Sequence, residues 1–102
     1  MNQAQLMQQM RKMQAEMTKA QEELAGTVVT GSASGDVVKI EMTGDHRVKS
    51  VSIAQEAMDP DDRETLEDLM VVAMNDAVAK VQEASDKRMG ALTGGLRIPG
   101  LT

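Results

Sequence analysis

Apolar residues in the first quarter of the chain recur at alternating intervals of four and three residues. This heptad spacing predicts a helix over residues 3–25 with one apolar stripe, and Gly26 provides a helix stop. Such a helix is about 36 Å long, which is too long for the rest of a small chain to wrap. We therefore expect a second helix, most simply from another copy of the chain, to cover the stripe. Its members are Leu6, Met10, Met13, Met17, Ala20 and Leu24.

Residues 27–54 change to a period of two, which is typical of half-buried strands. Turn residues at 31–36 and at 44–45 divide this region into three runs. Val48 is out of phase with the residues that follow it, which predicts a β-bulge or a strand start near Lys49. We predict a three-stranded antiparallel meander with one covered face. The inward positions of its second and third strands are Val38, Ile40, Met42, Val51 and Ile53.

Residues 59–89 return to helical spacing. The pair Asp59-Pro60 is a helix-start signal, Asp61 and Glu64 have capping-box spacing, and Gly90 is the expected stop. Lys87 and Arg88 near the end suit the negative pole of the helix dipole. The apolar stripe consists of Leu66, Met70, Ala73, Ala77, Val81 and Ala84.

The predicted order α-β-β-β-α gives an α+β fold with two long helices, and residues 1–102 form a single domain. Residues 91–102, which contain glycine and proline, are expected to be a flexible or docked tail. We assign the residues that form the core or a dimer seam on the two helices as Leu6, Met10, Met13, Met17, Leu24, Leu66 and Met70.

The amino-acid composition also favours a homodimer. The chain has ten Met and no Phe, Trp or Tyr, so the side chains that usually bury the largest areas are missing. A small aliphatic core is marginal, and a homodimer would add buried surface. With no Cys and one His, neither disulfides nor a Cys or His metal site is expected, and we predict no cofactor. No apolar run could span a membrane and no signal peptide is evident, which predicts a cytoplasmic protein with no membrane partner.

The candidates for catalysis are weak. Carboxylates are concentrated in residues 56–68, where they suit a helix start, and they lack the spacing of a calcium loop. His46 follows a turn and has no nucleophile nearby in the sequence. Thr93-Gly94-Gly95 lacks the strand, the Lys and the helix of a phosphate-binding loop. We therefore predict neither an enzyme nor a small-molecule substrate.

Charge is distributed unevenly along the chain. The net charge is −5, yet residues 1–15 carry +2, residues 87–102 carry +3 and residues 16–86 carry −10. If both helices project from the sheet, their basic ends could contact the phosphates of duplex DNA. Single-stranded nucleic acid is less suited, because no aromatic side chain can stack on bases. The alternative is a protein-interaction adaptor whose Met-rich helical arms bind a partner.

The ordered set of motifs resembles the YbaB/EbfC family of bacterial nucleoid-associated proteins. The resemblance covers nearly the whole chain. It rests on the opening rich in Gln, Met and Lys through Leu24, the short strands bounded by glycine, Asp59-Pro60, the run 66–77, Met89-Gly90 with Thr93-Gly94-Gly95, and Ile98-Pro99-Gly100.

The resemblance implies a tweezer-like homodimer in the nucleoid that binds double-stranded DNA with its long helices, bridges or compacts it, and has a role in gene regulation. It implies no catalysis. The family's DNA contacts are attributed to the long helices, which on this chain gives Arg11, Lys12, Lys19, Lys80, Lys87 and Arg88 as candidates. We add Arg97 from its charge alone. No motif indicates readout of bases, so weak sequence specificity is expected.

Overall fold

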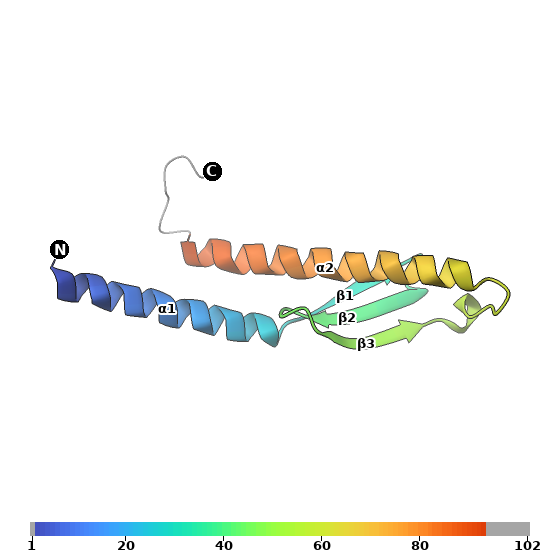
Figure 1. Cartoon of the computed structure of the whole chain (residues 1–102), viewed down its shortest axis with the longest axis horizontal. Coiled ribbons are helices and arrows are strands. Elements are labelled where there is room, and N and C mark those ends of the chain that lie inside the picture. Colours follow the sequence, from blue (N-terminus) through green and yellow to red (C-terminus); the bar gives the residue numbers. More distant parts are fainter. Residues whose placement is uncertain (1, 94–102) are drawn as a thin grey trace, which may run out of the picture.

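The structure, a computed structural model, describes residues 2–93 and has the predicted α-β-β-β-α order (Figure 1). The three strands form one antiparallel sheet in the order β1-β2-β3, as the meander predicted. The elements are α1 (Gln3–Ala25), β1 (Val28–Ala33), β2 (Val38–Thr43), β3 (Val48–Ile53), the short 3-10 helix η1 (Gln55–Ala57) and α2 (Arg63–Thr93).

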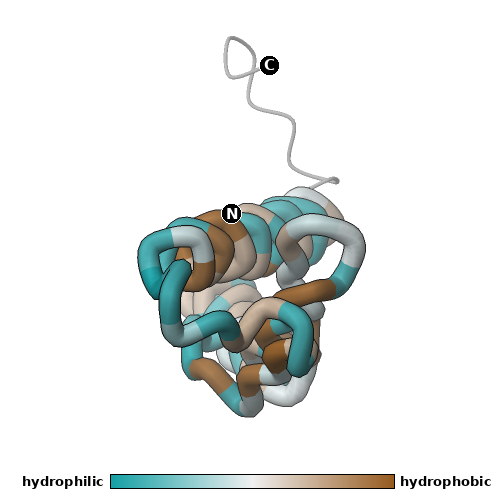
Figure 2. The backbone as a smooth tube through the Cα atoms, turned by 90° about the vertical axis from the view of Figure 1, so that its right-hand side faces the viewer, coloured by the Kyte–Doolittle hydropathy of each residue, from teal (hydrophilic) through white to brown (hydrophobic). Residues whose placement is uncertain are grey.

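The alternation in β2 and the irregularity in β3 are both confirmed. Val38, Ile40 and Met42 are buried, whereas Lys39 is exposed. The register of β2 against β3 shifts between Glu41 and Met42, because Ser50 pairs with Glu41 and Val48 pairs with Met42, so Lys49 is the extra residue. In the end-on view, hydrophobic and hydrophilic residues alternate along the tube (Figure 2).

Helix α2 packs across the sheet through small residues. Ala73, Ala77 and Val81 are fully buried against β1 and β2. A Cβ atom added to Gly31 of β1 would lie 2.4 Å from both the Ala73 carbonyl oxygen and the Ala77 nitrogen. The helix backbone therefore contacts the strand backbone at a distance that only glycine allows, which a core without aromatic side chains requires to avoid voids.

Helix α2 is much longer than the sheet that it covers. Its 31 residues span about 46 Å, whereas a six-residue strand spans about 20 Å. The second half of α2 therefore extends past the sheet and lies beside the end of α1 (Figure 1). Ala20 and Leu24 of α1 are buried there, and Arg88 of α2 is paired with Glu23. The long axis of the molecule reaches 70 Å, and we call the part beyond the sheet the arm.

The apolar stripe of α1 is only partly covered. Leu24 is buried, and Leu66 and Met70 of α2 are partly buried against the sheet core. Among residues 2–93, however, no helix lies against the outer part of the stripe. There Leu6, Met10, Met13 and Met17 are 46–57% exposed, and α1 extends beyond the end of α2 (Figure 1).

The predicted turn at 31–36 was too long. Strand β1 continues through Ala33, because Gly31 serves the close approach of α2 rather than a turn. The turn itself is formed by Ser34, Gly35 and Asp36, which all have positive φ angles.

The predicted limits of α2 were also wrong. The Asp59 carboxylate accepts a hydrogen bond from the Asp61 backbone N–H, which forms a local turn and delays the helix start to Arg63. Gly90 does not end the helix, which continues to Thr93. Residues 91–93 are therefore helical rather than part of the tail, and the remainder of the predicted tail lies outside the described residues.

The two glycines predict opposite stability effects. Gly31→Ala should lower the free energy of unfolding by about 1–3 kcal/mol, because the new methyl group overlaps the α2 backbone. Gly90→Ala should raise it by about 0.5–1 kcal/mol, because the added Cβ meets nothing within 4 Å and alanine favours the helix. Urea denaturation followed by circular dichroism measures both. Equal effects of the two substitutions would contradict the close approach at Gly31.

Candidate nucleic-acid interface

The outer end of α1 is a single exposed helix with no acidic residue. Residues 2–15 contain Arg11 and Lys12 as their only charged side chains, and all of them are exposed. Asn2 begins the helix with a capping box, in which its side chain accepts a hydrogen bond from the Gln5 backbone N–H at 2.8 Å. The first turn of the helix is thus capped by an amide and not by a carboxylate. No negative side chain among residues 2–15 therefore repels a phosphate.

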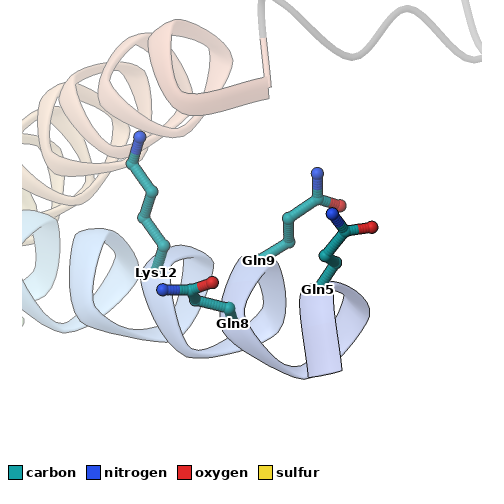
Figure 3. Close-up of a pocket in the computed structure, with 4 residues that line it drawn as sticks. All are labelled: Gln5, Gln8, Gln9 and Lys12. Atoms are coloured by element: carbon teal, nitrogen blue, oxygen red, sulfur yellow. The ribbon is translucent and has the colours of Figure 1, made fainter. Parts of the chain in front are cut away.

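Figure 3 shows how the polar face of this helix end is arranged. Gln5, Gln8, Gln9 and Lys12 line one hollow on its surface. They are spaced at three or four residues, so three amides and one ammonium group share a face of the helix. Lys12 extends to the side of α1 on which α2 lies (Figure 3). This face offers hydrogen-bond donors and a cation, which are the groups that contact phosphate and sugar oxygens.

Two further predicted residues lie closer to the sheet. Lys19 of α1 and Lys87 of α2 are exposed and have no ion pair among the described residues. Lys12 and Lys19 are seven residues apart and therefore lie along one line of α1. The acids of this inner part of the arm, which are Glu16, Glu22, Glu23, Glu83 and Asp86, weaken its positive potential relative to the outer end.

Arg88 has a contact inside the arm. Its Nε donates a hydrogen bond to the Glu23 carboxylate at 2.9 Å, and this ion pair joins α2 to α1. Beside it lies a groove of about 380 Å³ whose apolar lining includes Leu24, Ala84 and Ala91. Arg88 therefore holds the two helices together, and its charge is already partly compensated.

Lys80 also has partners within the fold. Its Nζ donates a hydrogen bond to the Thr30 carbonyl oxygen at 2.8 Å and forms an ion pair with Asp76 at 3.1 Å. Asp76 in turn accepts a hydrogen bond from the Ser32 backbone N–H at 2.9 Å. These two side chains of α2 occupy the backbone groups on the outer edge of β1. The hydrogen bond from Ser32, followed by the contact with Lys80, holds the pKa of the Asp76 carboxyl below its usual range.

The predicted DNA-contacting residues are therefore not equivalent. Arg11, Lys12, Lys19 and Lys87 are exposed along the arm, whereas Lys80 and Arg88 have structural partners. Arg97 lies outside the described residues. Sequence reasoning missed the contact of Asp76 and Lys80 with β1, although their spacing of four residues is a signal for a helix ion pair.

Other candidate sites remain without support in the described part of the chain. His46 is exposed in the β2–β3 turn with a φ of 64°. Within residues 2–93, no group of three or more His, Cys, Asp or Glu residues is arranged to hold a metal ion. No helix in that range is long and apolar enough to span a bilayer.

Comparisons with known proteins agree with this arrangement. The profile of the YbaB/EbfC DNA-binding family matches residues 1–96. A nucleoid-associated protein of Chloroflexus aurantiacus is 50% identical over 97 residues, which cover 95% of this chain and 97% of that protein. One from a Roseiflexus species is 50% identical over 100 residues, covering 98% and 99%. An uncharacterized protein from Helicobacter pylori has the same fold, with a TM-score of 0.76 at 22% identity, covering 95% and 99%.

The contact between Asp76 and β1 predicts a pH-dependent stability. Because the pKa of Asp76 is lower in the folded state than in the unfolded chain, its contribution is present at neutral pH and is lost as the pH falls below about 4. Asp76→Asn should therefore lower the melting temperature at pH 7, and the difference from wild type should shrink at pH 2.5. Asp68→Asn, at an exposed position of α2, is the control. A loss of the same size at both pH values would contradict this role.

Proposed function

The chain belongs to the YbaB/EbfC DNA-binding family, and we propose that it is a nucleoid-associated protein that binds double-stranded DNA as a homodimer through its arms. The observation that carries this proposal is the acid-free outer end of α1, residues 2–15, where Arg11 and Lys12 are exposed. The family is a DNA-binding family rather than an enzyme family. The relatives' description as nucleoid-associated proteins supports a location in the nucleoid and therefore in the cytoplasm.

The number of available cations matches a moderate, salt-sensitive affinity. On the two long helices, four exposed cations lack an ion pair among the described residues, and these are Arg11, Lys12, Lys19 and Lys87. Two copies would present eight, and about six to ten phosphate contacts give affinities that fall steeply with salt. One copy alone falls below this number. Dimer formation is therefore part of the proposed mechanism and not an addition to it.

The exposed surface of the single chain also favours a dimer. Its accessible area is 7797 Å², whereas a compact monomer of 11.0 kDa exposes about 5,600 Å². The surplus is well above the roughly 800 Å² that each partner buries in a standard interface. A second copy of the chain is the simplest partner to bury this surface, because it is present wherever the chain is.

We infer that the two copies meet on the side of the sheet that carries β3. Asp76 and Lys80 occupy the outer edge of β1, but no hydrogen bond from another described element reaches the outer edge of β3. Val48 and Val51 of β3 are each 46% exposed. On α2, the flank opposite Asp76 carries two more exposed valines, Val71 and Val78. Together these four valines form an apolar surface, which we call the valine face.

Contacts to phosphates would position the protein on the duplex and read little sequence. With an arm from each copy, one dimer could hold two segments of DNA or grip one segment from two sides. Both arrangements would bridge or compact DNA. Occupation of promoter DNA would then affect gene expression, which is the regulatory role that the family resemblance implies.

A second candidate function is that of an adaptor that binds a protein partner. The observation in its favour is the exposed stripe of Leu6, Met10 and Met13 on the same helix end. For an adaptor, Met10→Asp should abolish partner binding, and Arg11→Ala with Lys12→Ala should leave it intact.

DNA binding should depend on the outer end of α1. Arg11→Ala with Lys12→Ala should weaken duplex binding and reduce the slope of log K against log salt by up to about 3.6, because four phosphate contacts per dimer are lost at about 0.9 each. The control is Lys39→Ala with Arg63→Ala, which changes the net charge equally on the sheet outer face and at the start of α2. Fluorescence anisotropy with a labelled duplex at several salt concentrations measures both slopes.

Two outcomes would exclude this mechanism. One is an equal loss of affinity in the test and control variants, which would mean that only the net charge matters. The other is binding to duplex DNA that does not change with salt, because phosphate contacts always release counterions.

The dimer should depend on the valine face. Val51→Asp places a charge on the proposed interface and should produce monomers at micromolar concentration. Val72→Asp is the matched control, because Val72 is 54% exposed and lies on the α2 flank that carries Asp76. Sedimentation equilibrium gives the mass of each variant. A Val51→Asp variant that remains dimeric, or a wild-type chain that is monomeric at the same concentration, would refute this interface.

A further inference from the structure

We propose that Gln8 and Gln9 of α1 read adenine bases in the major groove of duplex DNA. This inference rests on the proposed function and deepens it, because it adds base contacts to the phosphate contacts of Arg11 and Lys12. Both glutamines are exposed in the acid-free outer end of α1. Their side-chain amides have no hydrogen-bond partner among residues 2–93, so both amide groups of each are available to a base.

Gln5, the third glutamine of this face, already has a partner. Its side-chain oxygen accepts a hydrogen bond from the Asn2 backbone N–H at 3.4 Å, as part of the capping box. A glutamine reads adenine with its whole amide, because the oxygen accepts from the N6 amino group while the nitrogen donates to N7. We therefore assign base reading to Gln8 and Gln9, and to Gln5 the stabilisation of the helix end that carries them.

The outer end of α1 has the size that the major groove admits. A helix with its side chains is about 10–12 Å across, and the major groove is about 12 Å wide and about 8.5 Å deep. Because α1 extends beyond the end of α2 (Figure 1), this end can enter the groove without the second helix. The minor groove, about 6 Å wide, is too narrow for a helix.

The two basic residues indicate which side of the helix faces the bases. Lys12 follows Gln8 by four residues and Gln9 by three, so the three side chains share one face. The side chains of Gln9 and Lys12 extend to the same side of α1 (Figure 3). Arg11 lies about 60° around the helix from Gln8, where it would contact the phosphates at one wall of the groove. The amides would then face the base edges while Arg11 holds the backbone.

Glu16 limits how far the helix can enter the groove. It follows Lys12 by four residues, so it lies on the same face one turn further along, and the phosphates on both sides of the groove would repel its carboxylate. The acid-free residues 2–15 span about 20 Å, which exceeds the depth of the groove. The helix should therefore enter with its N-terminal turns, which is how recognition helices present their first residues to base edges.

A duplex in which 7-deazaadenine replaces adenine tests this proposal, because it lacks the N7 acceptor but keeps base pairing and the minor groove. At one salt concentration, the full-length wild type should bind the native duplex at least about fivefold more tightly than the 7-deaza duplex of the same sequence. The Gln8→Ala, Gln9→Ala variant should bind both equally. Neither glutamine is charged, so this variant should keep the wild-type slope of log K against log salt, unlike Arg11→Ala with Lys12→Ala.

The matched control is Gln3→Ala with Gln14→Ala. These two glutamines are exposed in the same acid-free segment. They lie on one line of α1, about three turns apart, and Gln14 is about two and a half turns from Gln5, which places both on the opposite side of the helix. Alanine favours the helix at all substituted positions, and circular dichroism confirms that each variant is folded. The control should keep the wild-type preference for the native duplex.

Three results would overturn the proposal. Equal binding of both duplexes by the wild type, with the usual salt dependence, would mean that the arm contacts phosphates alone, and the proposed function would survive. A preference that persists in the Gln8→Ala, Gln9→Ala variant would assign the reading of adenine to other residues. Absence of binding to either duplex at low salt would exclude the proposed function together with this inference.

Discussion

The close approach of α2 to β1 is the contact on which the rest of the molecule depends. Gly31 of β1 and Ala73 and Ala77 of α2 bring two backbones together at a distance that excludes any larger residue. A chain without aromatic side chains has few other means of filling a core, so it relies on small residues and close packing. Asp76 and Lys80 secure the same contact from the β1 edge.

This contact also determines the shape of the arm. Only the first half of α2 lies on the sheet, so its second half projects and supports α1 through Leu24 and the pair of Glu23 with Arg88 (Figure 1). Beyond the end of α2, α1 continues alone, and residues 2–15 of this part carry only positive charges. A single helix about 10–12 Å in diameter can approach a duplex closely, whereas the carboxylate-rich start of α2 repels phosphate. The fold thus separates a packed acidic base from an exposed basic end.

Much of this fold could be predicted from the sequence, because its periodicities are local. The alternation around Ile40, the bulge at Lys49 and the limits of α1 all follow from neighbouring residues. What failed depended on distant contacts. In the sequence, Gly31 and Gly90 cannot be distinguished from glycines that form turns or end helices. Only the position of α2 shows that Gly31 lies under a helix and that Gly90 lies within one. The partners of Lys80 and Arg88 are 50 and 65 residues away, so charge placement alone could not separate structural cations from available ones.

The natural distribution of methionine offers the most direct test of the claim that the outer arm binds DNA. Methyl NMR of the wild-type chain can report separately on Met7, Met10 and Met13 of the arm and on Met42 and Met70 of the core. On titration with a short duplex at low salt, the account predicts shifts in the arm methyl groups, unchanged core methyl groups, and reversal of the shifts when salt is added. Shifts confined to the core, or no shift in the arm at saturating DNA, would contradict it.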